Sequence, residues 1–183
     1  VQSGMGRTGR MFAIEHFGVE PDIICLAKGI ASGMPLGAMI AREDVMTWKP
    51  GSHASTFGGN PIACAAALET ISLLEEELIH NAVVVGDYLK GLLQALKDKH
   101  PMVGDVRGLG LMLAIDLVKD RQTMEPDVEL RNELVQSCFQ KGLLLLGCGQ
   151  SAIRFCPPLV IHERDAATAV RILDQALVEH HRR

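Results

Sequence analysis

A long helical stretch in the middle of the chain constrains its fold more than any other feature. Asparagine is a good helix N-cap and proline is favoured at the first helical position, so Asn60-Pro61 predicts the start of a helix. The run that follows, residues 62–74, is small and apolar on nearly every side, which predicts a closely packed, buried helix. A second helix is predicted from about Ala82 to Lys99, where a His-Pro pair ends it. Its apolar side chains form one stripe: Val85, Leu89, Leu92, Leu93 and Leu96.

Short apolar runs on both sides of this stretch predict strands. The first 60 residues are dense in glycine and proline, and within them Asp22–Ala27 and Gly37–Ala41 are expected to form short buried strands. The later elements are expected in this order: strands 103–106 and 111–117 around a turn at 107–110, a helix over 128–141, strands 143–146 and 153–156, and a helix over 163–180. The pattern predicts an α/β fold in two parts. Residues 1–80 are expected to belong to a larger sheet domain, and residues 81–183 to form a small α/β domain with its linking helix.

Composition limits the classes of function. With 48% hydrophobic and 22% charged residues, the chain has the profile of a globular protein. Aromatic residues make up 4% and the formal net charge is −4, which argues against a surface for nucleic acid or anionic lipid. No apolar run reaches the roughly 18 to 20 residues of a membrane span. The five cysteines are an odd number and include no Cys-x-x-Cys pair, which argues against a disulfide framework and against a metal site. The cytoplasm is the expected location.

Lys28 is the most informative single residue, because it follows a predicted buried strand and precedes a glycine. A lysine in such a place is costly unless its surroundings pair or neutralise it. A neutral lysine amine can attack a carbonyl to form a Schiff base, and the neighbouring glycine leaves room for a flat ring. The alternative is that Lys28 is simply the first solvated residue after the strand.

Two glycine-containing loops are candidate anion sites. Ser55–Pro61 combines hydroxyls, flexible glycines and a helix N-terminus, which suits a phosphate, although capping by Asn60 explains the same residues. Gly4–Gly9 matches G-x-G-x-x-G, but only three residues precede it and Gly18 soon closes the segment after it. A flexible loop is therefore favoured there over a dinucleotide site.

Two arginines could bind a carboxylate. Arg154 lies in a predicted strand between apolar neighbours, where its guanidinium could hold a carboxylate by a bidentate pair or form an internal ion pair. Arg107 could do either, and a role in turn architecture is favoured for it.

Taken together, these segments resemble the class III pyridoxal-phosphate-dependent aminotransferases, in particular the group of 4-aminobutyrate, ornithine and acetylornithine enzymes. The match runs from end to end with intact spacing. It rests on residues 1–9 (VQSGMGRTG), 21–24 (PDII), 26–29 (LAKG), 55–61 (STFGGNP), 105–112 (DVRGLGLM) and 153–159 (IRFCPPL). The resemblance implies the C-terminal part of the large domain of the fold type I transferases, followed by their small α/β domain.

The resemblance also implies roles for four residues. Lys28 would form the Schiff base with pyridoxal 5′-phosphate and move the proton at the substrate Cα. Gln2 would lie beside the phenolic oxygen of the cofactor. Thr56, more than Ser55, would reach a cofactor phosphate bound mainly by the other subunit of a homodimer, and Arg154 would clamp a substrate carboxylate. The implied reaction is ping-pong transfer of an amino group from an amino acid or ω-amino acid to 2-oxoglutarate.

The family carries an Asp-Glu pair immediately before the segment that begins here at Val1. The resemblance therefore implies only part of the cofactor site, and a chain of this extent is expected to be inactive or very weak by itself. Two alternatives stay open. One is a pyridoxal-phosphate-dependent amino-acid racemase on the same scaffold, for which a stretch like Leu143–Gly149 is typical. The other is a non-catalytic α/β fragment that only dimerises or binds a partner. The exact amino donor also stays open.

Overall fold

The computed structural model describes residues 1–181. The chain divides into two compact units, Val1–His80 and Asn81–Arg183, termed here the N-terminal unit and the C-terminal unit. Helices and sheets occur in both, which confirms the mixed α/β prediction. Every strand pair among the described residues is antiparallel.

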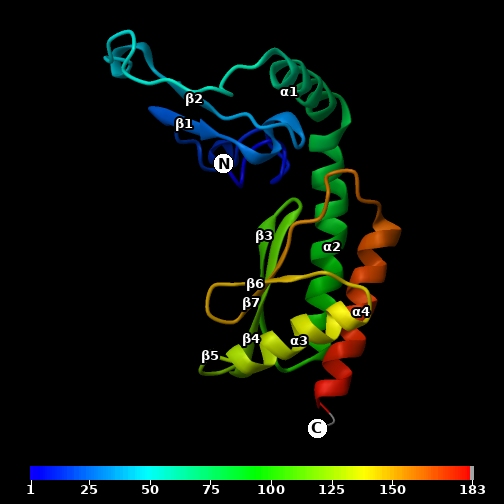
Figure 1. Ribbon diagram of the computed structural model, residues 1–183. Helices are drawn as coiled ribbons and strands as arrows, with labels where there is room; N and C mark the ends of the chain where they lie inside the picture. The colour runs from blue at the N-terminus through cyan, green and yellow to red at the C-terminus, as the bar shows by residue number, and fades with distance from the viewer. Residues whose placement is uncertain (182–183) are drawn as a thin grey trace. The chain divides into compact units, whose positions relative to one another are not determined.

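A two-stranded sheet and one long helix form the framework of the N-terminal unit (Figure 1). Strands β1 (Ile23–Leu26) and β2 (Ala38–Ala41) pair from Ile23↔Ala41 to Leu26↔Ala38. Both lie where the sequence predicts strands, but the expectation that they are buried is wrong, because their residues alternate between exposed and half-buried. A sheet of only two strands has few neighbouring elements that could cover its faces. The other elements are η1 (Ala13–Phe17), η2 (Lys28–Ala31), η3 (Glu43–Val45) and α1 (Pro61–Leu73).

Helix α1 begins where the sequence predicts it. The Oδ1 atom of Asn60 accepts a hydrogen bond from the Ala63 amide at 2.9 Å, which is the expected N-cap. The expectation of a fully buried helix is wrong, since Ile62 and Leu68 are 70% and 71% exposed. Only the face that meets η2 is buried. The helical backbone then continues through a π-helical turn, η4 (Leu74–Leu78), into α2 (Ile79–Lys99), because no glycine or proline interrupts the chain there.

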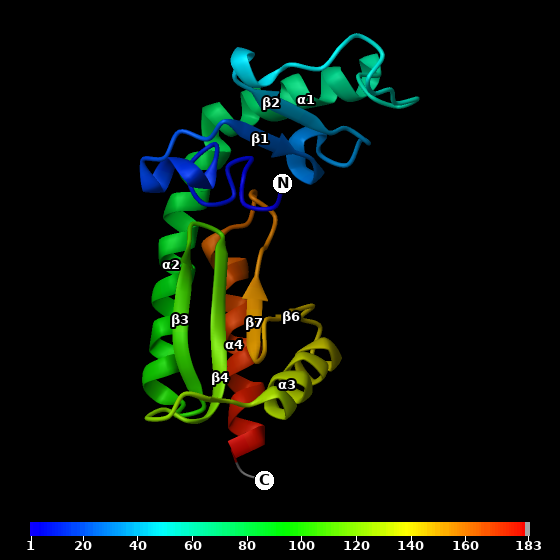
Figure 2. The ribbon, with the colours of Figure 1, turned by 90° about the vertical axis from the view of Figure 1, so that its left-hand side faces the viewer.

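An antiparallel sheet covered by helices forms the C-terminal unit. Its strands are β3 (Val103–Leu109), β4 (Met112–Asp120), β5 (Glu125–Pro126), β6 (Leu146–Cys148) and β7 (Ala152–Phe155). The spatial order is β3-β4-β7-β6, with β5 paired to β4. Figure 2 shows the sheet with α2 and α4 (Glu163–His181) behind it, while α3 (Val128–Gln140) packs on α4 near the β6 edge.

One hydrophobic core fills the space between this sheet and its helices. Strand β4 alternates, so Leu113, Ile115 and Leu117 are fully buried while Ala114 and Asp116 are half-buried between them. The helices contribute the fully buried side chains Leu93, Leu134, Leu173 and Leu177. Burying one such side chain stabilises a fold by about 1.5–3 kcal/mol, which makes this core the main source of stability in the unit.

Several boundaries differ from the sequence prediction. Strand β3 runs through Arg107 to Leu109, so the turn is shorter than expected. Gly108 makes this possible, because at its φ of +127° a Cβ would lie 2.1 Å from the Met112 carbonyl oxygen. Strand β6 begins only at Leu146, where pairing with Arg154 of β7 starts. Helix α3 is capped at both ends: Asp127 accepts from the Leu130 amide at 2.9 Å, and Gly142 has a positive φ just after the helix.

Candidate functional site

Lys28 is placed by the end of β1 and the start of η2. It has a left-handed backbone, with φ +52°, a conformation that costs a residue with a Cβ about 1–2 kcal/mol. The side chain is exposed within the described chain, as in the alternative in which Lys28 is the first solvated residue after the strand. The amine makes no ion pair or hydrogen bond within residues 1–181. An exposed primary amine is accessible to a carbonyl compound, which its neutral form can attack.

The segment that carries Gln2 runs beside the strand that leads to Lys28. The amino group of Val1 donates a hydrogen bond to the Cys25 carbonyl at 3.1 Å, and Gln2 itself is exposed. The N-terminal segment and β1 share a cavity of about 410 Å³. Its lining includes Val1, Ser3, Gly4, Phe12 and residues 23–26. The structure therefore brings the Gln2 segment and the approach to Lys28 together within one unit.

The G-x-G-x-x-G segment beside it lacks the surroundings of a dinucleotide site. Within the described residues no strand precedes Gly4, and the only helical element before Gly18 is the short turn η1. The loop is closed by internal bonds, including a 3.1 Å contact between the Thr8 hydroxyl and the His16 ring. Thr8 is buried, so this loop has a packing role.

Thr56 lies in the exposed connection between η3 and α1. Ser55, its neighbour, is engaged in the loop, because its hydroxyl accepts the Gly58 amide at 3.0 Å. Asn60 adds a second constraint through the bond from its side-chain amide to the Phe57 carbonyl at 2.9 Å. The Thr56 hydroxyl has no hydrogen-bond partner in the described part of the chain. The structure does not bring Thr56 into contact with Lys28, and it leaves this hydroxyl accessible.

Arg154 lies on β7, at the opposite phase from the fully buried Ile153. It is half-buried and pairs in register with Ala114 and Leu146. Within the described residues no carboxylate lies within ion-pair distance of it, so the internal ion pair that the sequence allowed does not form there. Arg154 borders an apolar cavity of about 410 Å³ in the C-terminal unit. The other residues around it include Leu143–Leu146, Phe155–Pro158 and Asp165.

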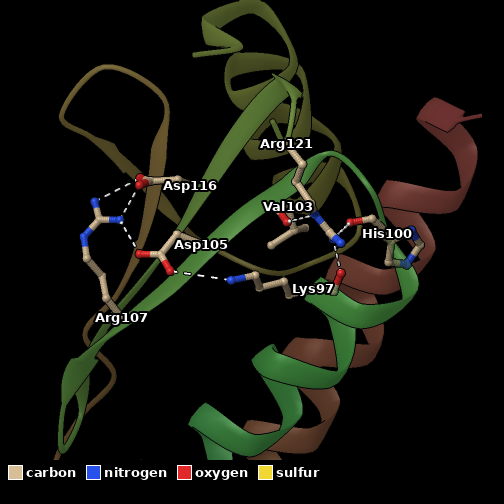
Figure 3. Close-up of polar contacts among 7 residues, drawn as sticks. All are labelled: Lys97, His100, Val103, Asp105, Arg107, Asp116 and Arg121. Carbon is tan, nitrogen blue, oxygen red and sulfur yellow. Dashed lines mark hydrogen bonds and ion pairs between the residues drawn. The ribbon is translucent and has the colours of Figure 1, made fainter. Parts of the chain in front are cut away.

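Arg107 is committed to a structural role, but in a strand and not in a turn. Asp105 and Asp116 are directly opposite each other in the β3–β4 ladder, where two like charges repel. Figure 3 shows the Arg107 guanidinium between them. It donates to Asp105 at 3.3 Å and to Asp116 through two nitrogens, and Lys97 approaches Asp105 at 3.7 Å. The hydrogen bonds to Asp116 raise the pKa of Arg107 above its usual value.

Two further groups of polar contacts, one around Arg121 and one around Asp174, hold the end of α2, and neither was predicted from the sequence. The Arg121 guanidinium donates to the carbonyls of Lys97, His100 and Val103 (Figure 3). The buried His100 ring meets Asp174 of α4 at 2.6 Å, and Lys99 binds the same carboxylate. These partners are 18 to 75 residues apart, so no local pattern could indicate them.

Burial raises the pKa of the Asp174 carboxyl, but hydrogen bonds from Lys99 and His100 outweigh it, so that the pKa lies below its ordinary value. Burial also raises the pKa of the Cys138 thiol, to about 11. All five cysteines are free, and among residues 1–181 no group of histidine, cysteine, aspartate and glutamate side chains could hold a metal ion. None of the helices in this range has the length and hydropathy to cross a membrane.

Comparison with protein families gives a match to aminotransferase class III over residues 1–177. Curated relatives include acetylornithine aminotransferase of Caldanaerobacter subterraneus, 41% identical, and 4-aminobutyrate aminotransferase GabT of Escherichia coli, 44% identical; each alignment covers 98% of this chain. A leucine/methionine racemase of Thermococcus litoralis is 40% identical over 98% of this chain. The chain spans 44%, 43% and 41% of these three proteins, which is less than half of each.

Solved structures that match this chain are also aminotransferases, and they too are longer than this chain. A Bacillus anthracis aminotransferase superposes with a TM-score of 0.90 at 36% identity, over 97% of this chain and 43% of its own. A pyridoxal-phosphate-bound amine transaminase from an uncultivated Pseudomonas species has a TM-score of 0.87 at 37% identity, over 96% of this chain and 42% of its own.

Proposed function

Because this chain belongs to the class III aminotransferase family, whose members use pyridoxal phosphate, we propose that it carries part of the machinery for amino-group transfer. The proposed donors are amino acids or ω-amino acids of the 4-aminobutyrate and ornithine class, and the proposed acceptor is 2-oxoglutarate. The names of the relatives from Caldanaerobacter subterraneus and Escherichia coli support this donor class. The observation that carries the proposal is the exposed amine of Lys28 at the end of β1, which has no hydrogen-bond or ion-pair partner within residues 1–181.

The polar side chains of the N-terminal unit are of the kinds that could bind the cofactor. Lys28 offers an amine that would bind the cofactor aldehyde, and Gly29 places no side chain beside it. The exposed Gln2 amide, on the segment next to β1, would donate to the phenolic oxygen. When bound, pyridoxal phosphate supplies the electron sink for the substrate carbon.

Within this proposal Lys28 has a second task beside binding the cofactor, and Thr56 and Arg154 have one each. The Lys28 amine accepts and returns the proton at the substrate Cα. The Thr56 hydroxyl, left free while Ser55 is engaged by its own loop, donates to a phosphate oxygen, and we propose that this phosphate belongs to the second subunit of a homodimer. Arg154 binds a substrate carboxylate through two of its guanidinium nitrogens, and it is available for this because it has no ion-pair partner within residues 1–181.

The direct test is to trap the cofactor on the chain. The protein is incubated with pyridoxal phosphate and reduced with borohydride, and the labelled peptides are mapped by mass spectrometry. We expect Lys28 to be labelled well above Lys49, which is also exposed in the N-terminal unit. The Lys28→Arg variant keeps the charge and should lose that label. Equal labelling of Lys28 and Lys49 would contradict a formed site.

Catalysis is tested by supplying 4-aminobutyrate, ornithine or N-acetylornithine with 2-oxoglutarate and measuring glutamate. Sedimentation with and without the cofactor tests the homodimer. The Arg154→Lys variant keeps the charge but loses the planar fork, so it should bind carboxylate substrates more weakly, which calorimetry measures without turnover. An unchanged affinity would remove Arg154 from the substrate site.

A second function on the same residues is amino-acid racemisation. The 40% identity to the Thermococcus litoralis racemase supports it. Here Lys28 would return the proton to the substrate Cα from the other face, directly or through a partner base. Chiral analysis of the products formed without any oxo acid separates the two functions, because racemisation without amino transfer excludes the first.

A further inference from the structure

A buried pair of hydroxyls joins the Lys28 segment to helix α1. Thr70 is one of the few buried polar side chains among the described residues, and it lies on the face of α1 that also buries Ala63 and Ala67. Its hydroxyl donates to the Ala66 carbonyl at 2.7 Å, and its oxygen is 2.9 Å from the hydroxyl of Ser32. A threonine hydroxyl has a single hydrogen, so Ser32 is the donor in the second bond.

Ser32 follows directly on η2, the turn that Lys28 opens. Both residues have a positive φ, +52° at Lys28 and +46° at Ser32, although neither is a glycine. Backbone in this region persists only where the surrounding structure holds it, and such strain gathers at functional sites. Between them Ile30 and Ala31 are 6% and 1% exposed and lie against α1, so one end of the turn is anchored by packing.

We propose that the Ser32–Thr70 hydrogen bond is a positioning pair that holds the η2 turn on α1 and thereby sets the direction of the Lys28 amine. The inference rests on the proposed role of Lys28 and deepens it. Thr70 touches neither Lys28 nor any reacting atom, so it acts only through the turn. Two consecutive hydrogen bonds run from the Ser32 hydroxyl to the Thr70 hydroxyl and from there to the Ala66 carbonyl. They link the strained segment to the backbone of a regular helix.

The test compares Thr70→Val, which keeps the shape and removes the hydroxyl, with Thr70→Ser, which keeps the hydroxyl. Ser72→Ala is the matched control, because it also removes a hydroxyl from α1, but one that bonds Glu76 at 2.9 Å. The first readout needs no cofactor and measures the amide hydrogen exchange of residues 27–34. In this segment the Ser32 amide donates a hydrogen bond to the Gly29 carbonyl at 3.4 Å. The second is the Lys28-to-Lys49 ratio of borohydride-trapped pyridoxal phosphate.

In Thr70→Val we expect exchange of this segment to speed up, and the labelling ratio to fall, by roughly three- to tenfold, the range that one lost hydrogen bond explains. Thr70→Ser and Ser72→Ala should match the parent protein in both readouts. Ser32→Ala should give the same loss as Thr70→Val, and the double variant no further loss, because both changes break one bond.

Unchanged exchange and labelling in Thr70→Val, or additive losses in the double variant, would overturn the positioning role. Failure of the proposed function is a different outcome: the parent protein then shows no preference for Lys28 over Lys49. The exchange measurement decides in that case whether Thr70 holds the turn. If Thr70→Val melts at a lower temperature, the comparison of Ser32→Ala with the double variant still decides the outcome.

Discussion

The two units of this molecule use the same kinds of element but bury them very differently. In the C-terminal unit, residues between Ala82 and Leu177 form one continuous core, and its helices turn one apolar stripe to the sheet. In the N-terminal unit only a few apolar side chains are buried, among them Met5, Ile30 and Ala31. Large apolar side chains there are exposed instead, such as Phe57 at 70%. The C-terminal unit thus holds the large apolar core, whereas the N-terminal unit carries Lys28, the proposed reactive amine, and its positive-φ turn.

The same substitution in the two units should show this contrast most strongly. Leu93 on α2 is fully buried and Leu68 on α1 is 71% exposed. We expect Leu93→Ala to lower the free energy of unfolding by about 2–5 kcal/mol, because it leaves a cavity. Leu68→Ala should change it by about 0.5 kcal/mol or less. Urea denaturation followed by circular dichroism measures both, and equal losses would contradict the difference in burial.

Two glycines of α2 give the next largest effect. A Cβ at Gly86 would lie 2.4 Å from the carbonyl carbon and oxygen of Gly110, whereas nothing lies within 4 Å of one at Gly91. Gly86→Ala should therefore destabilise the C-terminal unit by about 1–3 kcal/mol. Gly91→Ala should stabilise it by about 0.5–1 kcal/mol, since alanine is the better helix former. A stable Gly86→Ala protein would show that α2 does not touch the β3–β4 turn.

The Asp174 carboxylate should give a smaller, pH-dependent effect. Its pKa is lowered in the folded state, so its contribution is present above the unfolded pKa of about 3.9 and is lost as the pH falls through the folded value. Asp174→Asn should cost about 1–2 kcal/mol at neutral pH and flatten the loss of stability in acid. Asp98→Asn, the same charge change at an exposed residue of α2, should do neither. An unaltered acid limb in Asp174→Asn would contradict this role.

The last comparison concerns the reactivity of two thiols and not the free energy of unfolding. Cys138 of the C-terminal unit is fully buried and its thiol has a pKa of about 11, while Cys25 of the N-terminal unit is exposed. Because the thiolate is the reactive form, alkylation at pH 8 should be at least about 100-fold slower at Cys138 than at Cys25. Peptide mapping after timed alkylation measures the ratio. Similar rates would mean that α3 opens readily.

Local signals in the sequence were reliable where the physics is local. The cap at Asn60 is found where predicted, because a cap depends on residues within one helical turn. The predicted stripe of α2 is buried except at Leu92, which is partly buried. The burial of the first 80 residues could not be predicted in this way. An apolar run indicates that a surface is suited to burial, but it does not indicate whether another element packs on it. In β1, β2 and α1 much of the apolar surface is exposed within the described chain.

The sequence by itself determined the family, the order of the elements and the candidate residues Lys28, Gln2, Thr56 and Arg154, because motifs and helix signals are written in neighbouring residues. Only the tertiary structure decided which charges are engaged and which are available. Arg107 is held by Asp116 across a hairpin, Arg154 has no ion-pair partner in the described chain, and Thr70 meets Ser32 from 38 residues away. Such contacts depend on distances in space between segments far apart in the chain, which no local pattern records.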